Sequence, residues 1–212
     1  MDETFSARGI IIKRRPIKNN DLTVTVYTLE RGRLELLARG AQKFKAKSTA
    51  HLEPFNLVSL MIIRGKSQNY LGSAIAIDCF ADLKSDFNKI KVAGAGLNLF
   101  EKLIKGEEAD PEIFALLMNF LDNLNKTKGK DDFIYLIFAF KLICLLGYTP
   151  DLESGMRDRV LRGECPLTIS DNCIKMLKLM IRDDFLTLLK IDPESVFPET
   201  ERFVNLLIKN LY

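Results

Sequence analysis

The sequence predicts an α+β protein with an N-terminal five-stranded OB-fold β-barrel followed by an all-helical domain. Residues 4–80 contain five short apolar or β-branched runs separated by turn residues, which fit a small closed barrel. From about Phe80 the apolar residues recur instead at the spacing of an amphipathic helix. We therefore expect an OB-fold domain over residues 1–80 and a helical domain over residues 81–212.

The strands are predicted from alternation and from the turns between them. Residues 22–29 alternate threonine with apolar side chains, as a half-buried strand does. A turn at residues 30–32 leads into a strand whose Leu34 and Leu36 face one side and whose Arg33 faces the other. The five predicted strands are residues 5–15, 22–29, 33–41, 54–64 and 70–77.

The helices are predicted from apolar spacing and from their end residues. Asp110 followed by Pro111 is typical of a helix start, with Asp as the cap and Pro in the first turn. Residues 133–146 are apolar nearly all round, which predicts the central helix of a bundle, and Gly147 closes it. The predicted helical segments are residues 83–104, 110–124, 133–146 and 171–182, then a short helix, then residues 199–212. Ser170 or Asp171 is the predicted cap of the fourth segment.

The N-terminal region concentrates positive charge. Residues 1–80 hold 13 Lys or Arg and 7 Asp or Glu, a net charge of +6, whereas residues 81–212 hold 18 and 21, a net charge of −3. Residues 27–47 alone carry six basic side chains against two acidic ones. A hairpin that continues into a basic loop suits a phosphate backbone, so we expect the barrel to bind a polyanion.

Binding of a single strand needs cations along the backbone and flat side chains on which bases stack. The candidate stacking side chains are Tyr27, Phe44 and Tyr70, with a core position as the alternative for both tyrosines. The residues predicted to contact DNA are Lys13, Arg14, Arg31, Arg33, Arg39, Lys43, Phe44, Lys45, Lys47, Arg64 and Lys66.

Catalytic, metal and membrane functions find little support in the residues. His51 is the single histidine and has no nucleophile motif near it, and Gly94–Gly96 lacks the third glycine of a dinucleotide-binding loop. No cysteines form a CxxC pair, and Cys79 and Cys144 lie in apolar runs, where cysteine packs as a small hydrophobe. Neither an export signal nor a membrane-spanning run is present. We predict a cytoplasmic protein that is not an enzyme and needs no cofactor.

Several stretches resemble the bacterial recombination-repair mediator RecO. Thr28, Gly32, Leu34, Ala38 and Gly40 lie at the spacing of one motif of that family, before a basic loop. The resembling stretches are GIIIKRR at 9–15, TVYTLERGRLELLARGAQK at 25–43, LEPFNLVSLMIIRGK at 52–66, DPEIFALLMNFLDNL at 110–124 and FAFKLICLLGYTPDL at 138–152.

The resemblance implies an OB barrel on a helical domain that binds single- and double-stranded DNA and anneals complementary strands. It also implies action with RecR and the single-strand-binding protein in loading RecA on gapped DNA, in the cytoplasm and at the nucleoid. The acidic, hydrophobic C-terminal tail of the single-strand-binding protein would then meet Lys141, with Leu145 and Tyr148 beside it. The alternative for Lys141 is a side chain that only extends to the surface.

The sequence departs from the family pattern at two places. Many members carry a four-cysteine zinc site after the LLGY motif, whereas residues 153–156 contain no cysteine and only Cys165 and Cys173 follow. Two thiols cannot complete a tetrahedral structural site, so we predict no metal. The Lys-Ser-containing tail common in the family is also absent, so contacts made by that tail are not carried over.

Two other classes of function stay open at this point. The barrel of a plain adaptor would bind protein, and such a barrel would more often present an apolar face than the charge found between residues 31 and 47. An RNA-binding OB-fold would use the same backbone cations and stacking rings as a DNA-binding one.

Overall fold

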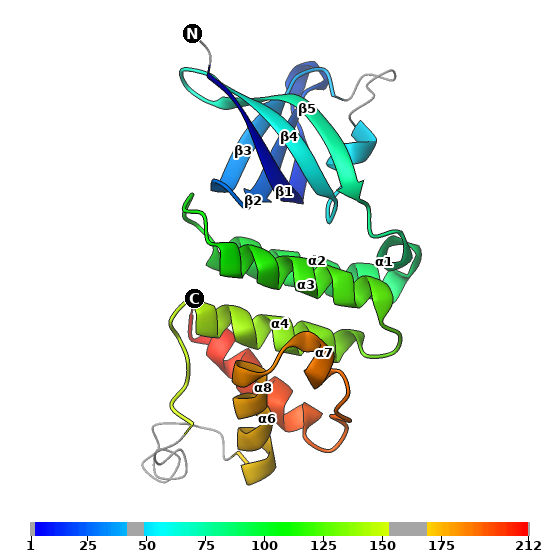
Figure 1. The fold of residues 1–212 in the computed structure, drawn as a ribbon, viewed down its shortest axis with the longest axis vertical. Coiled ribbons are helices and arrows are strands. Elements are labelled where there is room, and N and C mark those ends of the chain that lie inside the picture. The colour runs from blue at the N-terminus through cyan, green and yellow to red at the C-terminus, as the bar shows by residue number, and fades with distance from the viewer. Residues whose placement is uncertain (1–2, 42–48, 153–168, 212) are drawn as a thin grey trace. The chain divides into compact units, whose positions relative to one another are not determined.

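The computed structural model describes residues 3–41, 49–152 and 169–211 of the chain. It divides into two compact units, Met1–Lys126 and Thr127–Tyr212. The first unit contains all five described strands and the helices α1, α2 and α3, and the described helices of the second unit are α4, α6, α7 and α8 (Figure 1). The predicted division into residues 1–80 and 81–212 stays a prediction.

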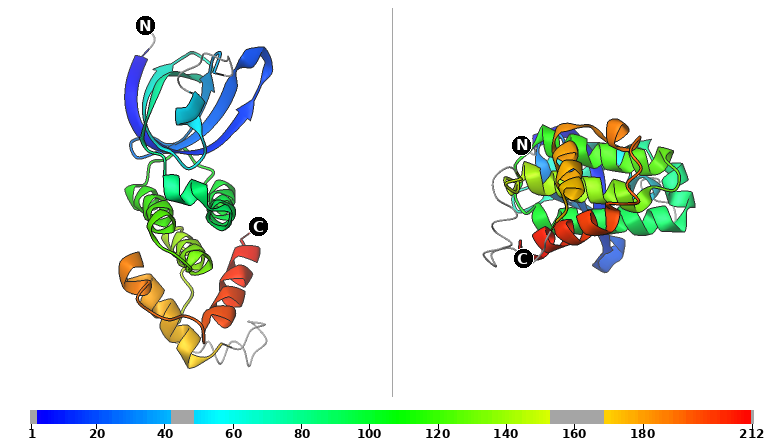
Figure 2. Two further views of the ribbon diagram at one scale, coloured as in Figure 1. Left: turned by 90° about the vertical axis from the view of Figure 1, so that its right-hand side faces the viewer. Right: turned by 90° about the horizontal axis from the view of Figure 1, so that it is seen from below.

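The first unit begins with a closed barrel (Figures 1 and 2). The strand order is β1-β2-β3-β5-β4, which confirms the predicted five-stranded OB-fold class. All neighbours are antiparallel except β3 and β5, which are parallel and pair only at Leu36–Asn69 and Leu37–Tyr70. The strands are β1 (Glu3–Pro16), β2 (Leu22–Thr28), β3 (Gly32–Ala38), β4 (Leu57–Arg64) and β5 (Asn69–Asp78), with the 3-10 helices η1 (Lys18–Asn20) and η2 (Thr49–Leu52).

The barrel is filled by the side chains that alternate inward. On β3, Leu34 and Leu36 are buried, whereas Glu35 is exposed, as the period of two predicted. Val26 on β2 and Ile62 on β4 are fully buried in the same core. Each such aliphatic side chain contributes about 1.5–3 kcal/mol by leaving water. These side chains form the core of the barrel.

The strand β2 is more buried than its alternation predicted. Tyr27 is fully buried, because its ring meets Phe100 edge-on at 4.9 Å and stacks on Phe114 at 6.5 Å between ring centroids. Burial raises the pKa of the Tyr27 hydroxyl above its usual value. The interpretation of Tyr27 as a platform for bases is therefore wrong, and the core alternative holds.

The turn between β2 and β3 is fixed by Thr28 and Gly32. The Thr28 hydroxyl donates to the Gly32 carbonyl at 2.9 Å and accepts from the Arg31 amide at 3.1 Å. Gly32 has a φ of +65°, and a Cβ there would lie 2.3 Å from the Glu108 carbonyl oxygen and 2.5 Å from that of Glu107. Only glycine suits both the positive φ and the close approach of this backbone. The turn places Arg31 at the mouth of the barrel.

The helices of the first unit are α1 (Ala81–Ser85), α2 (Phe87–Leu103) and α3 (Pro111–Lys126). The helical segment predicted over residues 83–104 is broken at Asp86, whose side chain accepts from the backbone amides of Asn88 and Lys89 and so starts α2. Asp110 caps α3 as predicted, with Oδ1 accepting from the Glu112 amide at 2.8 Å.

The second unit is built on α4 (Asp131–Leu145), whose side chains are buried over most of its length. Around it lie α6 (Asp171–Arg182), α7 (Phe185–Leu188) and α8 (Phe197–Lys209). Ser170 caps α6 as predicted, by accepting from the Cys173 amide at 3.2 Å. No helix in the described ranges is both long and apolar enough to cross a membrane.

Two smaller expectations are corrected. The strand β3 ends at Ala38 and not at residue 41, because Gly40 has a φ of +63° and its amide donates to Asp21 Oδ1 at 2.6 Å. Cys79 is exposed after β5, so it does not pack as a small hydrophobe there.

Candidate nucleic-acid interface

Three of the predicted DNA-contacting residues are held in ion pairs. Lys13 and Arg33 both approach Glu101, at 3.2 and 3.7 Å, and the Arg33 guanidinium also donates to the Ile104 carbonyl. Arg14 pairs with Glu53 at 2.7 Å. Their charges are therefore offset in place, and a phosphate would have to compete with a carboxylate for each of them.

The other described cations lie on a different part of the barrel. Arg31 and Arg39 stand at the two ends of the β3 hairpin segment, and Arg64 and Lys66 stand where β4 turns into β5. Within residues 3–41, 49–152 and 169–211, no acidic side chain forms an ion pair with Arg31, Arg39 or Lys66. Charge without a local counter-ion is what a phosphate backbone requires.

Aromatic rings lie under two of these guanidiniums. The Arg31 Cζ is 5.3 Å from the centroid of the Phe5 ring, and the Arg39 Cζ is 4.6 Å from that of Tyr70. A guanidinium over a ring is attracted to its face, so both cations are held in place before a ligand arrives. Of the two positions that the sequence left open for Tyr70, the surface and the core, the structure shows the surface, beside Arg39.

Sequence reasoning missed Phe5. It opens the first strand, far from the basic hairpin in sequence, and only the antiparallel pairing of β1 with β4 brings it opposite Ile62 near the Arg64 end. An aromatic side chain at the start of a predicted strand was the one available signal.

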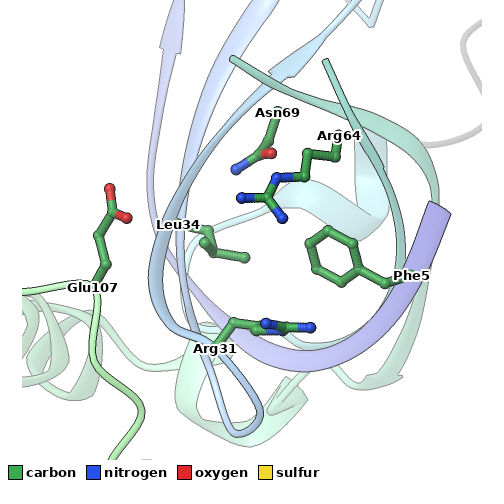
Figure 3. A pocket seen from close by; sticks show the side chains of 6 residues that line it. All are labelled: Phe5, Arg31, Leu34, Arg64, Asn69 and Glu107. Carbon is green, nitrogen blue, oxygen red and sulfur yellow. The ribbon is translucent and has the colours of Figure 1, made fainter. Parts of the chain in front are cut away.

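Three adjoining cavities run along this surface, and we call them together the β3–β5 trough. The first, of about 230 Å³, is lined by Phe5, Arg31, Leu34, Arg64, Asn69 and Glu107 (Figure 3). A second, of about 570 Å³, shares Leu34, Asn69 and Glu107 with it, and a third, of about 560 Å³, shares Leu37 and Ser67 with the second. The third cavity is lined by Arg39, Lys66 and Tyr70 among others.

The trough follows from the local fold. The strands β3 and β5 pair over only two residues on each side, so the barrel has a short seam there. The turn beside it is tight, because the Gly65 amide donates to the Gln68 carbonyl at 3.0 Å and a Cβ on Gly65 would lie 2.6 Å from the Tyr70 ring. This turn presents Lys66 and Ser67 at its tip.

Four predicted contact residues, Lys43, Phe44, Lys45 and Lys47, lie outside the described residues and stay predictions. His51 lies in η2, where its Nδ1 accepts from the Ala76 amide at 3.2 Å. Cys165 also lies outside the described ranges, and Cys173 is buried with its Sγ 3.5 Å from the Thr200 hydroxyl. Within those ranges no cluster of His, Cys, Asp or Glu could hold a metal ion.

The residues predicted to bind a protein partner gather at the end of α4. Leu145 is 39% exposed and Tyr148 is 58% exposed, while Lys141 is half-buried. Burial lowers the pKa of the Lys141 ammonium, and the nearby charges of Asp183 and Asp184 partly offset this effect. Asp184 also caps α7, because its Oδ1 accepts from the Thr187 amide at 2.7 Å.

The comparisons with known proteins agree with this architecture. The family model described as recombination protein O N terminal matches residues 1–80, and the one described as recombination protein O C terminal matches residues 84–160. Among the similar proteins named DNA repair protein RecO, that of Syntrophomonas wolfei is 27% identical over 147 residues, which are 69% of this chain and 58% of the relative. That of Syntrophotalea carbinolica is 30% identical over 152 residues, 71% of this chain and 58% of the relative.

A further relative, from a Thermoanaerobacter species, is 22% identical over 215 residues, which cover 92% of this chain and 87% of that protein. The chain thus spans less than two thirds of the length of the first two relatives and most of the third. With both family regions matched in order and the OB-fold ring in place, the chain belongs to the recombination protein O (RecO) family.

Proposed function

We propose that this protein is a DNA repair and recombination mediator whose barrel binds single-stranded DNA along the β3–β5 trough. The observation that carries the proposal is the grouping of Arg31, Arg39 and Lys66, without ion pairs among the described residues, beside a trough that also holds two aromatic rings. Single-strand binding requires cations that track a backbone, and here aromatic rings hold two of these cations in place.

The same surface gives a physical route to annealing. Two complementary strands repel each other through their phosphates, and each Lys or Arg that binds one strand lowers this repulsion. A strand whose phosphates lie against Arg39 and Lys66 can keep base edges exposed for a partner strand. Annealing by this protein is therefore part of the proposal, and so is the loading of RecA together with RecR and the single-strand-binding protein, for which membership of the family is the support.

The end of α4 is proposed to bind the C-terminal tail of the single-strand-binding protein. The exposed Leu145 and Tyr148 offer apolar surface, and Lys141 offers a cation for a terminal carboxylate. Lys141→Met should weaken binding of a peptide with this acidic and hydrophobic sequence by about tenfold, the loss of one charge-assisted contact. Lys175→Met, an exposed change on α6, is the matched control, and equal affinities for both variants would remove Lys141 from the site.

One observation favours a second candidate, the adaptor. The outer face of β4 and β5 is apolar and exposed, with Met61 at 41%, Ile75 at 64% and Ile77 at 53%. If the barrel binds only protein, RecR is the partner proposed for this face. The Ile75→Ser substitution would then weaken RecR binding and leave affinity for DNA unchanged.

Fluorescence anisotropy of labelled DNA and RNA strands of one sequence, measured over a salt series, tests the main proposal. Binding that weakens steeply with salt supports it, with a logarithmic slope of about −0.7 for each phosphate contact. Tighter binding of RNA than of DNA would favour the RNA-binding interpretation. Absence of binding at low salt would leave only the adaptor.

A further inference from the structure

The first cavity of the trough lies at the mouth of the barrel. Figure 3 shows the Arg64 guanidinium pointing into this pocket between Asn69 and Phe5, with Arg31 on the opposite side. Its volume of about 230 Å³ is below the range of about 300–1,000 Å³ that suits drug-sized ligands. A space of this size suits a phosphate and part of a sugar.

The lining of this pocket selects an anion. Two guanidiniums face one small space, and guanidinium forks match the oxygens of a phosphate. The Arg31 guanidinium is held over the Phe5 ring and forms no ion pair with a described residue. Glu107 lies to one side of the pocket (Figure 3) and would repel a phosphate from that rim toward Arg64.

The floor of the pocket closes the way through. Leu34 is 9% exposed and belongs to the barrel core, and Phe5 packs against the same core. An internal phosphodiester bound above this floor would need room for two stretches of backbone beside one small pocket. A terminal phosphate needs only one, and the neighbouring cavity, which shares Leu34 and Asn69, leads to it.

Charge favours the same ligand. A phosphate monoester carries about −1.5 to −2 at pH 7, compared with a single charge on a diester. Two arginines that converge on one pocket gain more from the monoester than from the diester.

We propose that the mouth pocket binds the phosphorylated end of a single strand, while the remainder of that strand lies along the trough. The inference rests on the proposed DNA binding and deepens it, since it makes the protein a reader of strand ends. The shared chemistry is a phosphate monoester, and the 5′ and 3′ ends are the two sources to be distinguished.

The test compares oligonucleotides of one sequence that carry a 5′ phosphate, a 3′ phosphate or hydroxyls at both ends. One phosphorylated form should bind about tenfold more tightly than the hydroxyl form, the factor of one charge-assisted contact. This preference should shrink as the pH falls through about 6, where the monoester loses its second charge. Arg31→Gln and Arg64→Gln should each reduce the preference toward onefold.

Arg202→Gln, which removes one exposed charge on α8, is the matched control and should keep the preference. Equal affinities for the three oligonucleotides overturn the inference and leave the proposed function standing. A preference that survives both Arg31→Gln and Arg64→Gln also overturns it, because the end is then bound elsewhere. Failure of all three to bind overturns the proposed function and this inference with it.

Discussion

Ion pairing separates the basic side chains of the barrel into two groups. An arginine whose charge is already offset by a carboxylate, such as Arg14 beside Glu53, must give up that pair before it can bind a phosphate. An arginine held on a ring, such as Arg39 on Tyr70, keeps its charge available and its position fixed. The residues of the second group should therefore determine the affinity for DNA.

Arg39→Gln should weaken single-strand binding by about tenfold and reduce the size of the salt slope by about 0.7, because one phosphate contact is lost. Arg14→Gln is the matched comparison and should leave the slope unchanged, since its charge is engaged by Glu53. Anisotropy titrations of both variants across a salt series measure the two slopes. An equal loss of salt slope in the two variants would show that ion pairing does not determine which arginines bind phosphate.

Gly32→Ala should lower the free energy of unfolding by about 1–3 kcal/mol, the cost of a left-handed backbone at a residue other than glycine. Steric overlap adds to this, because the new Cβ would meet the backbone of Glu107 and Glu108. Denaturant unfolding measures the loss. Gly94→Ala is the control, since nothing lies within 4 Å of its Cβ in α2, and it should stabilise the protein by about 0.5–1 kcal/mol.

At the scale of elements, local patterns predicted most of the fold. Alternation gave the inward face of β3, and the capping residues Asp110 and Ser170 gave the starts of α3 and α6. These features depend on neighbours along the chain. The break at Asp86 was missed because the apolar spacing continues across it, and only the cap shows where α2 starts.

The candidate site was less predictable because it depends on distant partners. Lys13 is balanced by Glu101, which lies 88 residues away in sequence. Tyr27 is buried by Phe100 and Phe114, which belong to helices that no strand pattern could place. Phe5 joins the site only through barrel closure. The sequence therefore identified the basic residues of the barrel. Which of them form ion pairs could be seen only in the structure.

The half-buried Lys141 makes a prediction about pH. Burial lowers its pKa below the usual 10.5, so the unfolded chain holds this proton more tightly than the folded protein. Stability should therefore rise with pH between the lowered pKa and about 10.5, where the unfolded state binds more protons. Lys84, whose pKa burial also lowers, contributes in the same direction.

Lys141→Met should remove the Lys141 part of that pH dependence and raise the unfolding midpoint at neutral pH. Thermal unfolding of the variant and of Lys175→Met at several alkaline pH values measures the difference. A Lys141→Met protein with an unchanged pH dependence would show that burial of this ammonium has no cost. Together with the tail-binding assay, the result would show whether the cation is kept for binding at the expense of stability.

Over the whole molecule, positive charge is concentrated in the barrel region, and the residues proposed to bind the tail of the single-strand-binding protein belong to the second unit. Residues 1–80 carry a net charge of +6, and residues 81–212 carry −3. Long-range attraction of nucleic acid should therefore act on the barrel region, with a rate of association that falls as salt rises. Partner binding at the end of α4 should depend less on salt, because apolar surface contributes much of it.

The central claim is that Arg31, Arg39, Arg64 and Lys66 form one surface for single-stranded DNA. The most direct test is anisotropy across a salt series for the unmodified chain and for a variant with all four changed to Gln, with circular dichroism to verify folding. We predict that the variant loses about 2.8 from the size of the salt slope, four contacts at about 0.7 each. A folded variant that keeps the slope and affinity of the unmodified chain would contradict the account.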